Sequence, residues 1–116
     1  MLKTTILVAS GGFFGTAFRF LINSFVKAAP FPTTLFINIA GCFLIGLVMG
    51  ASWKNAQWPL FLGAGFCGGF TTFSAFAMEN LTLLEKARYG TAALYILLSL
   101  VGGLLAAWIG FKMMNK

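Results

Sequence analysis

The chain has 116 residues, of which 59% are hydrophobic and 9% are charged, with a formal net charge of +6 and no histidine. A soluble domain usually carries about 25% charged residues, so this composition leaves too few polar side chains to cover a water-facing surface. A protein that binds nucleic acid would gather its basic residues on one face. Here they are scattered between apolar runs, as membrane-end anchors are, so nucleic acid is not an expected partner.

Four apolar stretches follow one another, at about residues 4–26, 33–53, 58–84 and 89–111. Each reaches the roughly 20 residues that a helix needs to cross the hydrocarbon core. Only helices and closed barrels satisfy their backbone hydrogen bonds in lipid, and the short connections leave no room for a soluble domain. The sequence predicts an all-α integral membrane protein in which residues 1–116 form a single domain of four transmembrane helices.

The first two spans each carry a row of small and polar residues at helical spacing. The row in the first span ends with Arg19 and Asn23, and the row in the second includes Thr34 and Asn38. Small residues let helices approach closely, which explains most of the glycines. An arginine at the centre of a span costs about 2.5–3.5 kcal/mol. We therefore interpret Arg19 as facing the bundle interior or a wet vestibule, although it could also extend toward the membrane surface, and Asn38 as a donor of two hydrogen bonds.

The third span is longer than the bilayer requires, because about 27 residues make a helix of roughly 40 Å. Two glycines and two threonines in its middle form helix poorly, which predicts a break near residues 68–74. Backbone groups freed by a break must face protein, water or an ion. A close-packed crossing of small residues is the alternative.

Two aromatic side chains, Phe73 and Phe76, share one face just after this break. Such pairs are more often packing than ligands, but a ring edge is the positive part of the aromatic quadrupole and could meet an anion. The fourth span adds Tyr95 and Ser99 to the polar positions.

The polar side chains inside the spans suit an anion better than a cation. The two carboxylates, Glu79 and Glu85, lie toward the end of the third span. Small four-span multidrug or cation exporters have a similar size, but they need a carboxylate in the first span, where this chain has an arginine. The candidate anion donors are Arg19, Asn38, Thr34, Thr71, Thr72, Ser74, Tyr95 and Ser99.

Basic residues are almost evenly divided between the two membrane sides. Four of them, Lys3, Lys54, Lys112 and Lys116, belong to the side that carries the termini, and three, Lys27, Lys86 and Arg88, belong to the other. Orientation follows the bias of lysine and arginine between the sides. The near balance predicts insertion in both orientations, unless subtler features select one.

Three motifs resemble those of the Fluc (CrcB) fluoride channels. They are Gly11-Gly-Phe-Phe-Gly15 with Arg19 in the first span, Phe36-Ile-Asn38-Ile-Ala-Gly41-Cys-Phe-Leu-Ile-Gly46 in the second, and Gly65-Phe-Cys-Gly68-Gly-Phe-Thr71-Thr-Phe73-Ser-Ala-Phe76 in the third. The resemblance covers essentially the whole chain in order. It implies a passive, fluoride-selective channel in the bacterial inner (plasma) membrane that exports fluoride, built as an antiparallel homodimer with two pores.

The resemblance also implies roles for individual residues. Asn38, Phe73 and Phe76 would line the pore, Tyr95 and Ser99 would belong to a polar track on the fourth helix, and Glu79 would be a carboxylate near the pore. A structural sodium ion would be held at the dimer centre by the main-chain carbonyls of Gly68 and Thr71 from both subunits. The full set of candidate pore residues is Arg19, Thr34, Asn38, Thr72, Phe73, Ser74, Phe76, Glu79, Tyr95 and Ser99.

Three other functions fit the sequence less well. A multidrug or cation exporter would need a carboxylate in the first span, where this chain has none. An accessory subunit of a larger complex would not need polar rows on its helices. An enzyme is not expected, because there is no histidine and neither serine nor cysteine has an evident base partner. Cys42 and Cys67 lie in apolar runs without a CxxC pattern, and we interpret them as free thiols.

Overall fold

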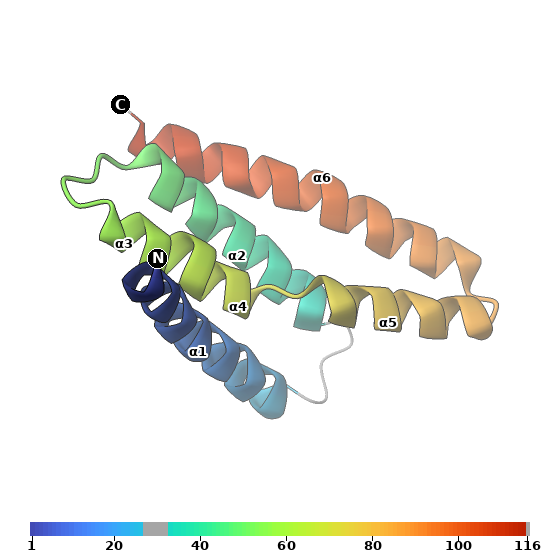
Figure 1. The fold of residues 1–116 in the computed structure, drawn as a ribbon. Helices are drawn as coiled ribbons and strands as arrows, with labels where there is room; N and C mark the ends of the chain where they lie inside the picture. Colours follow the sequence, from blue (N-terminus) through green and yellow to red (C-terminus); the bar gives the residue numbers. More distant parts are fainter. Residues whose placement is uncertain (27–32, 116) are drawn as a thin grey trace.

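The computed structural model describes residues 1–26 and 33–115 and is built from helices. Figure 1 shows the order α1 (Leu2–Phe25), α2 (Thr33–Gly50), α3 (Gln57–Pro59), the π-helix η1 (Leu60–Cys67), α4 (Gly68–Phe70), α5 (Phe73–Glu85) and α6 (Tyr89–Met114). α3, η1, α4 and α5 together form the third span, Gln57–Glu85, and four helical spans are long and apolar enough to cross a membrane. The prediction of an all-α, four-span membrane protein is confirmed.

The span limits differ from the expected ones at the ends. The second helix ends at Gly50 rather than near residue 53, and the fourth continues to Met114. Two residues of the basic-residue count, Lys27 and Lys116, lie outside the described residues.

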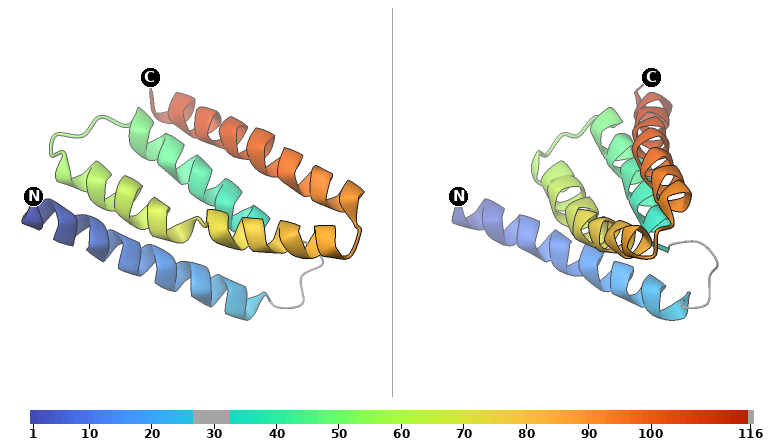
Figure 2. Two further views of the ribbon diagram at one scale, coloured as in Figure 1. Left: turned by 45° about the vertical axis from the view of Figure 1, so that its right-hand side comes forward. Right: turned by 90° about the vertical axis from the view of Figure 1, so that its right-hand side faces the viewer.

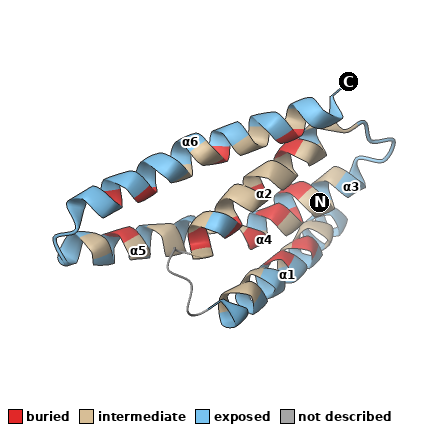
Figure 3. Ribbon diagram, turned by 180° about the vertical axis from the view of Figure 1, so that it is seen from behind, coloured by how far each residue is buried: buried red, intermediate tan, exposed pale blue. Residues whose placement is uncertain are grey.

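The spans lie side by side rather than in a ring. α6 packs mainly on α2, η1 packs on both α2 and α1, and α5 contacts α6. Figure 2 shows this arrangement from two further sides, with α1 and α6 at opposite edges. The buried residues lie between neighbouring helices, whereas the outer faces are exposed (Figure 3).

Those outer faces are apolar. Large exposed side chains include Phe13, Phe14, Phe20, Phe25, Leu104 and Trp108. A soluble protein rarely exposes so much contiguous apolar surface, whereas lipid is as apolar as these side chains. The surface therefore agrees with a protein that is surrounded by lipid or by further helices.

Glycines allow α1 and the third span to touch through their backbones. A Cβ at Gly15 would overlap the carbonyl of Phe66, and a Cβ at Gly69 would lie 2.5 Å from the carbonyl oxygen of Gly12. Only small residues permit this approach in membrane helices, so the glycines of the first-span motif bring α1 against the chain just before the break.

The third helix is broken, as predicted, but the threonines rather than the glycines make the break. Thr71 and Thr72 are extended, with φ/ψ of −86°/155° and −148°/118°. Gly68 and Gly69 remain helical in α4, and Gly69 lies so close to Gly12 of α1 that a Cβ would not fit there. The π-helix before them was not anticipated, since its i→i+5 hydrogen bonds leave no pattern in the sequence.

Candidate functional site

Asn38 on α2 holds the break in the third span from the side. Its Oδ1 accepts a hydrogen bond of 2.8 Å from the Thr72 amide, and its Nδ2 donates one of 3.0 Å to the Thr72 carbonyl. One side chain thus satisfies both backbone groups of an extended residue that lipid could not satisfy. Nδ2 carries two hydrogens, and the bond to Thr72 uses one of them.

Arg19 on α1 binds α4, the short helix directly before the break. Its Nε donates to the Gly69 carbonyl at 3.2 Å, and the Thr16 hydroxyl donates to the same oxygen at 3.4 Å. Arg19 is half-buried and is not among the residues that line the polar groove described below. Thr16 escaped the sequence reasoning, although it lies one helical turn before Arg19 and so shares its face.

Thr72 begins α5 as its N-cap. Its hydroxyl accepts from the Ala75 amide at 3.2 Å and shares a hydrogen bond of 3.1 Å with the Ser74 hydroxyl. In a continuous helix the Thr72 amide would donate to Gly68 and the Ala75 amide to Thr71. Both amides are used elsewhere, so the Gly68 and Thr71 carbonyls lose their α-helical partners.

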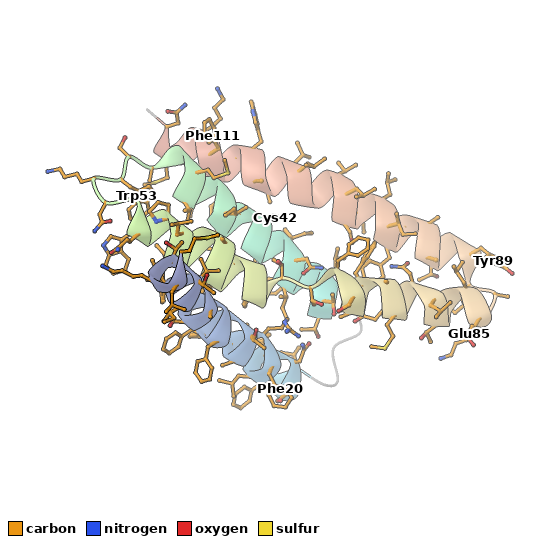
Figure 4. All side chains as sticks on the ribbon, viewed as in Figure 1. Phe20, Cys42, Trp53, Glu85, Tyr89 and Phe111 are labelled. Atoms are coloured by element: carbon orange, nitrogen blue, oxygen red, sulfur yellow. The ribbon has the colours of Figure 1, made fainter. Side chains whose placement is uncertain are left out.

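A groove of about 240 Å³ opens beside the break. Three helices and the break contribute its lining, which consists of Asn38, Cys42, Thr71, Thr72, Phe73, Phe76, Ser99 and Leu100. Cys42 marks its position midway along α2 (Figure 4). The Ser99 hydroxyl oxygen is buried and has no hydrogen-bond partner among the described residues. The fold therefore gathers five of the predicted pore residues, Asn38, Thr72, Phe73, Phe76 and Ser99, around one space.

A partly buried hydrogen-bonded cluster adjoins this groove. The Thr34 hydroxyl donates to Glu79 Oε2 at 2.6 Å, and the Tyr95 hydroxyl donates to Glu79 Oε1 at 2.7 Å. Thr34 and Tyr95 are each only 4% exposed. Three helices therefore meet at one carboxylate, each of whose oxygens accepts a hydroxyl hydrogen bond.

Phe76 connects the groove with this cluster. Its ring lies 5.3 Å from that of Phe73 and meets the Tyr95 ring edge to face, at 5.2 Å and 86° between planes. Phe73 is 76% exposed, so little within one chain packs against it. The two rings thus line the groove at the start of α5, and one of them also contacts the cluster.

Asn80 was missed as a polar residue of this region. It is 6% exposed, its Nδ2 donates to the Phe76 carbonyl at 2.9 Å, and its Oδ1 has no partner in the described part of the chain. Its place one turn after Phe76, on the same face of α5, is the signal that could have found it.

The polar side chains of the site are mainly hydrogen-bond donors. Within residues 1–26 and 33–115, no group of three or more His, Cys, Asp or Glu side chains could hold a metal ion. Cys42 and Cys67 are free thiols. Hydroxyls, an amide and aromatic rings surround the groove, and such groups can replace part of the hydration shell of a small anion.

Comparisons with known proteins match nearly the whole length of the chain. A family model described as "CrcB-like protein, Camphor Resistance (CrcB)" matches residues 6–111. The fluoride-specific ion channel FluC 2 of Rhodococcus jostii is 43% identical over 112 residues, covering 95% of this chain and 97% of that protein. The fluoride-specific ion channel FluC of Flavobacterium psychrophilum is 47% identical over 118 residues, covering 94% of each.

A third relative, the fluoride-specific ion channel FluC of Azobacteroides pseudotrichonymphae, is 40% identical over 120 residues, covering 96% of this chain and 95% of that protein. These relatives are named as ion channels, so the exporter alternative finds no support, and the expectation that the chain is not an enzyme agrees with their names. With the family model matching most of the chain and relatives above 40% identity along nearly its full length, the chain belongs to the CrcB family.

Proposed function

We propose that this protein is a passive fluoride channel of the bacterial plasma membrane, which lets fluoride leave the cell. The observation that carries the proposal is the groove in which Asn38, Phe73, Phe76 and Ser99 meet at the break of the third span. Relatives of similar length are named as fluoride-specific channels, and fluoride rather than another anion rests on those names and on the family motifs.

The physical problem for such a channel is desolvation. Moving a bare ion into a medium of low dielectric constant costs tens of kcal/mol, so donors must replace the water of a small, strongly hydrated anion. The candidate donors are the second Nδ2 hydrogen of Asn38, the Ser99 hydroxyl and the ring edges of Phe73 and Phe76. None of them carries a full positive charge, which favours binding weak enough for the ion to leave.

The cluster around Glu79 forms the candidate continuation of this path. Phe76 touches Tyr95, and Tyr95 and Thr34 hold the carboxylate by their hydroxyl hydrogens. Those hydroxyls could turn from the carboxylate to a passing anion, since a hydroxyl hydrogen rotates to suit its acceptor.

The active form in this proposal is an antiparallel homodimer with two pores. The groove is open on one side, and the exposed ring of Phe73 at its rim leaves surface for a second copy to cover. The nearly even division of basic residues supports insertion of the two copies in opposite orientations.

A sodium ion at the centre of the dimer belongs to the same proposal. The carbonyls of Gly68 and Thr71 would hold it, because the amides of Thr72 and Ala75 donate to side chains instead of to them. Carbonyl oxygens are suitable ligands for such a cation, so the donor set fits. The ion would compensate carbonyl dipoles between the subunits.

Flux from liposomes tests the proposal. Vesicles loaded with potassium fluoride and containing the purified protein should release fluoride when valinomycin provides the return path for charge, and vesicles loaded with chloride should release little. Release of chloride at a similar rate would contradict fluoride selectivity. Fluoride release that requires a proton gradient would contradict a passive channel.

A further inference from the structure

Gly41 on α2 receives the side chain of Thr71 from the break in the third span. Gly41 is buried, and a Cβ placed there would overlap the γ-methyl of Thr71 and lie 3.4 Å from the Cδ2 ring carbon of Phe70. At Gly46, on the same helix, a Cβ would instead overlap the backbone carbonyl of Ala107 on α6. Gly41 therefore makes room for one side chain, whereas Gly46 lets two helix backbones touch.

The Thr71 side chain is fixed at two points. Its methyl lies against Gly41, and its hydroxyl donates to the Cys67 carbonyl at 2.9 Å. The χ1 angle of a threonine has three staggered positions, and either of the other two would move the hydroxyl away from this carbonyl. The crowding caused by a Cβ at Gly41 could thus be relieved only by breaking the bond to Cys67 or by moving the backbone of the break.

Asn38, one helical turn before Gly41 on the same face of α2, fixes the next peptide. Its Oδ1 accepts from the Thr72 amide, and in a planar trans peptide the C=O of Thr71 points opposite to that N–H. The Thr71 carbonyl therefore points away from Asn38. If this peptide turned over, a carbonyl oxygen would face Asn38 at the edge of the polar groove, where an anion needs donors.

We propose that Gly41 is a positioning residue of the channel. By receiving the Thr71 methyl, it holds Thr71 in the extended conformation, with φ/ψ of −86°/155°, that presents the Thr72 amide to Asn38. Gly41 and Asn38 are neighbouring contacts of one helix face with two consecutive residues of the break. The expected effect on flux rests on the proposed function, whereas the effect on the Thr72 amide does not depend on conduction.

Hydrogen exchange of the Thr72 amide tests this role without a flux measurement. The full chain, purified in detergent with isotope-labelled threonine, gives one NMR signal for each threonine amide, and Thr72→Ser identifies the signal of interest. We expect this amide to exchange slowly, and Asn38→Ala to raise its exchange rate by about five- to tenfold, the size of one net hydrogen bond. Gly41→Ala should raise the rate to a similar extent and should also lower fluoride flux.

Paired substitutions separate the methyl contact from helix packing in general. Thr71→Ser removes the methyl and keeps the hydroxyl, so Gly41→Ala with Thr71→Ser should regain slow exchange and show more flux than Gly41→Ala alone. Gly41→Ala with Thr71→Val, which keeps a methyl, is the matched control and should regain neither.

Two results would overturn the proposal. One is slow exchange of the Thr72 amide in Gly41→Ala alone. The other is a failure of the pair with Thr71→Ser to regain slow exchange, even where Gly41→Ala by itself does not fold. The expected exchange rates in a protein without fluoride flux would support the positioning role of Gly41 and contradict the proposed channel function.

Discussion

The side-chain amide of Asn38 pairs with both backbone groups of Thr72, at 2.8 and 3.0 Å, and so replaces the helix that the third span lacks there. This pair joins α2 to the break and places Asn38 at the edge of the polar groove. The same residue is thus both an anchor of the backbone and a candidate donor to the anion.

Asn38→Asp keeps the hydrogen-bond acceptor of this side chain and removes its donor. The carboxylate can still accept from the Thr72 amide, but it faces the Thr72 carbonyl without a hydrogen and places a negative charge in the groove. We expect fluoride efflux from liposomes to fall by at least tenfold while the protein keeps its elution volume on a sizing column. Flux near that of the unchanged protein would remove Asn38 from the pore.

Phe76→Ile and Phe73→Ile test the rings against simple packing. Apolar exchanges of similar volume usually cost less than about 1.5 kcal/mol, so thermal stability should change little. Isoleucine has no positively polarised edge, and we expect flux to drop strongly. Phe66→Ile, at a ring stacked on Phe70 at 5.8 Å, is the control and should keep flux. A parallel loss of stability and flux in the groove variants would favour packing.

Tyr95→Phe removes one of the two hydroxyl donors to Glu79 and leaves the ring in place. An acceptor left unsatisfied in a buried site costs about 1–3 kcal/mol, so a lower melting temperature is expected together with reduced flux. Thr34→Val should act in the same direction, because it removes the other donor. The control, Tyr89→Phe at an exposed tyrosine, should change neither quantity. An unchanged flux in Tyr95→Phe would exclude the Tyr95 hydroxyl from the path.

Arg19→Gln tests whether the arginine acts on the anion or on the backbone. Because its Nε donates to the Gly69 carbonyl, we expect stability to fall by about 1.5–3 kcal/mol, as for a hydrogen bond that involves a charged group, with flux per folded protein little changed. Thr16→Ala, which removes the other donor to this carbonyl, should have a smaller effect of the same kind. Normal stability with lost flux would indicate instead that Arg19 acts on the permeating anion.

Asn55→Cys in a protein whose Cys42 and Cys67 are serine tests orientation. The residue lies in the exposed connection between α2 and α3, and a membrane-impermeant thiol reagent should label about half of the molecules in intact cells, with the rest labelled only after lysis. Labelling of all or none of the molecules from outside would contradict dual insertion.

Composition and apolar run lengths were enough to predict the four spans, because the thickness of the bilayer sets helix length regardless of tertiary contacts. The break was also predictable, since two glycines and two threonines interrupt a run longer than the membrane requires. The predicted region, residues 68–74, contains the observed break at Thr71 and Thr72. That the two glycines stay helical was not predictable, because the close contact of Gly69 with Gly12 of α1 is a tertiary one.

The sequence by itself determined which residue types are available to meet an anion. Their spacing along each helix also placed them on common faces. Only the tertiary structure decided how they are used. It directs Arg19 and Asn38 to backbone carbonyls and surrounds Glu79 with hydroxyls from two other helices. The physical reason is that these partners are between 16 and 50 residues apart in the chain. Helical periodicity orders residues within one span, whereas the packing of one span on another selects the partner of each polar group.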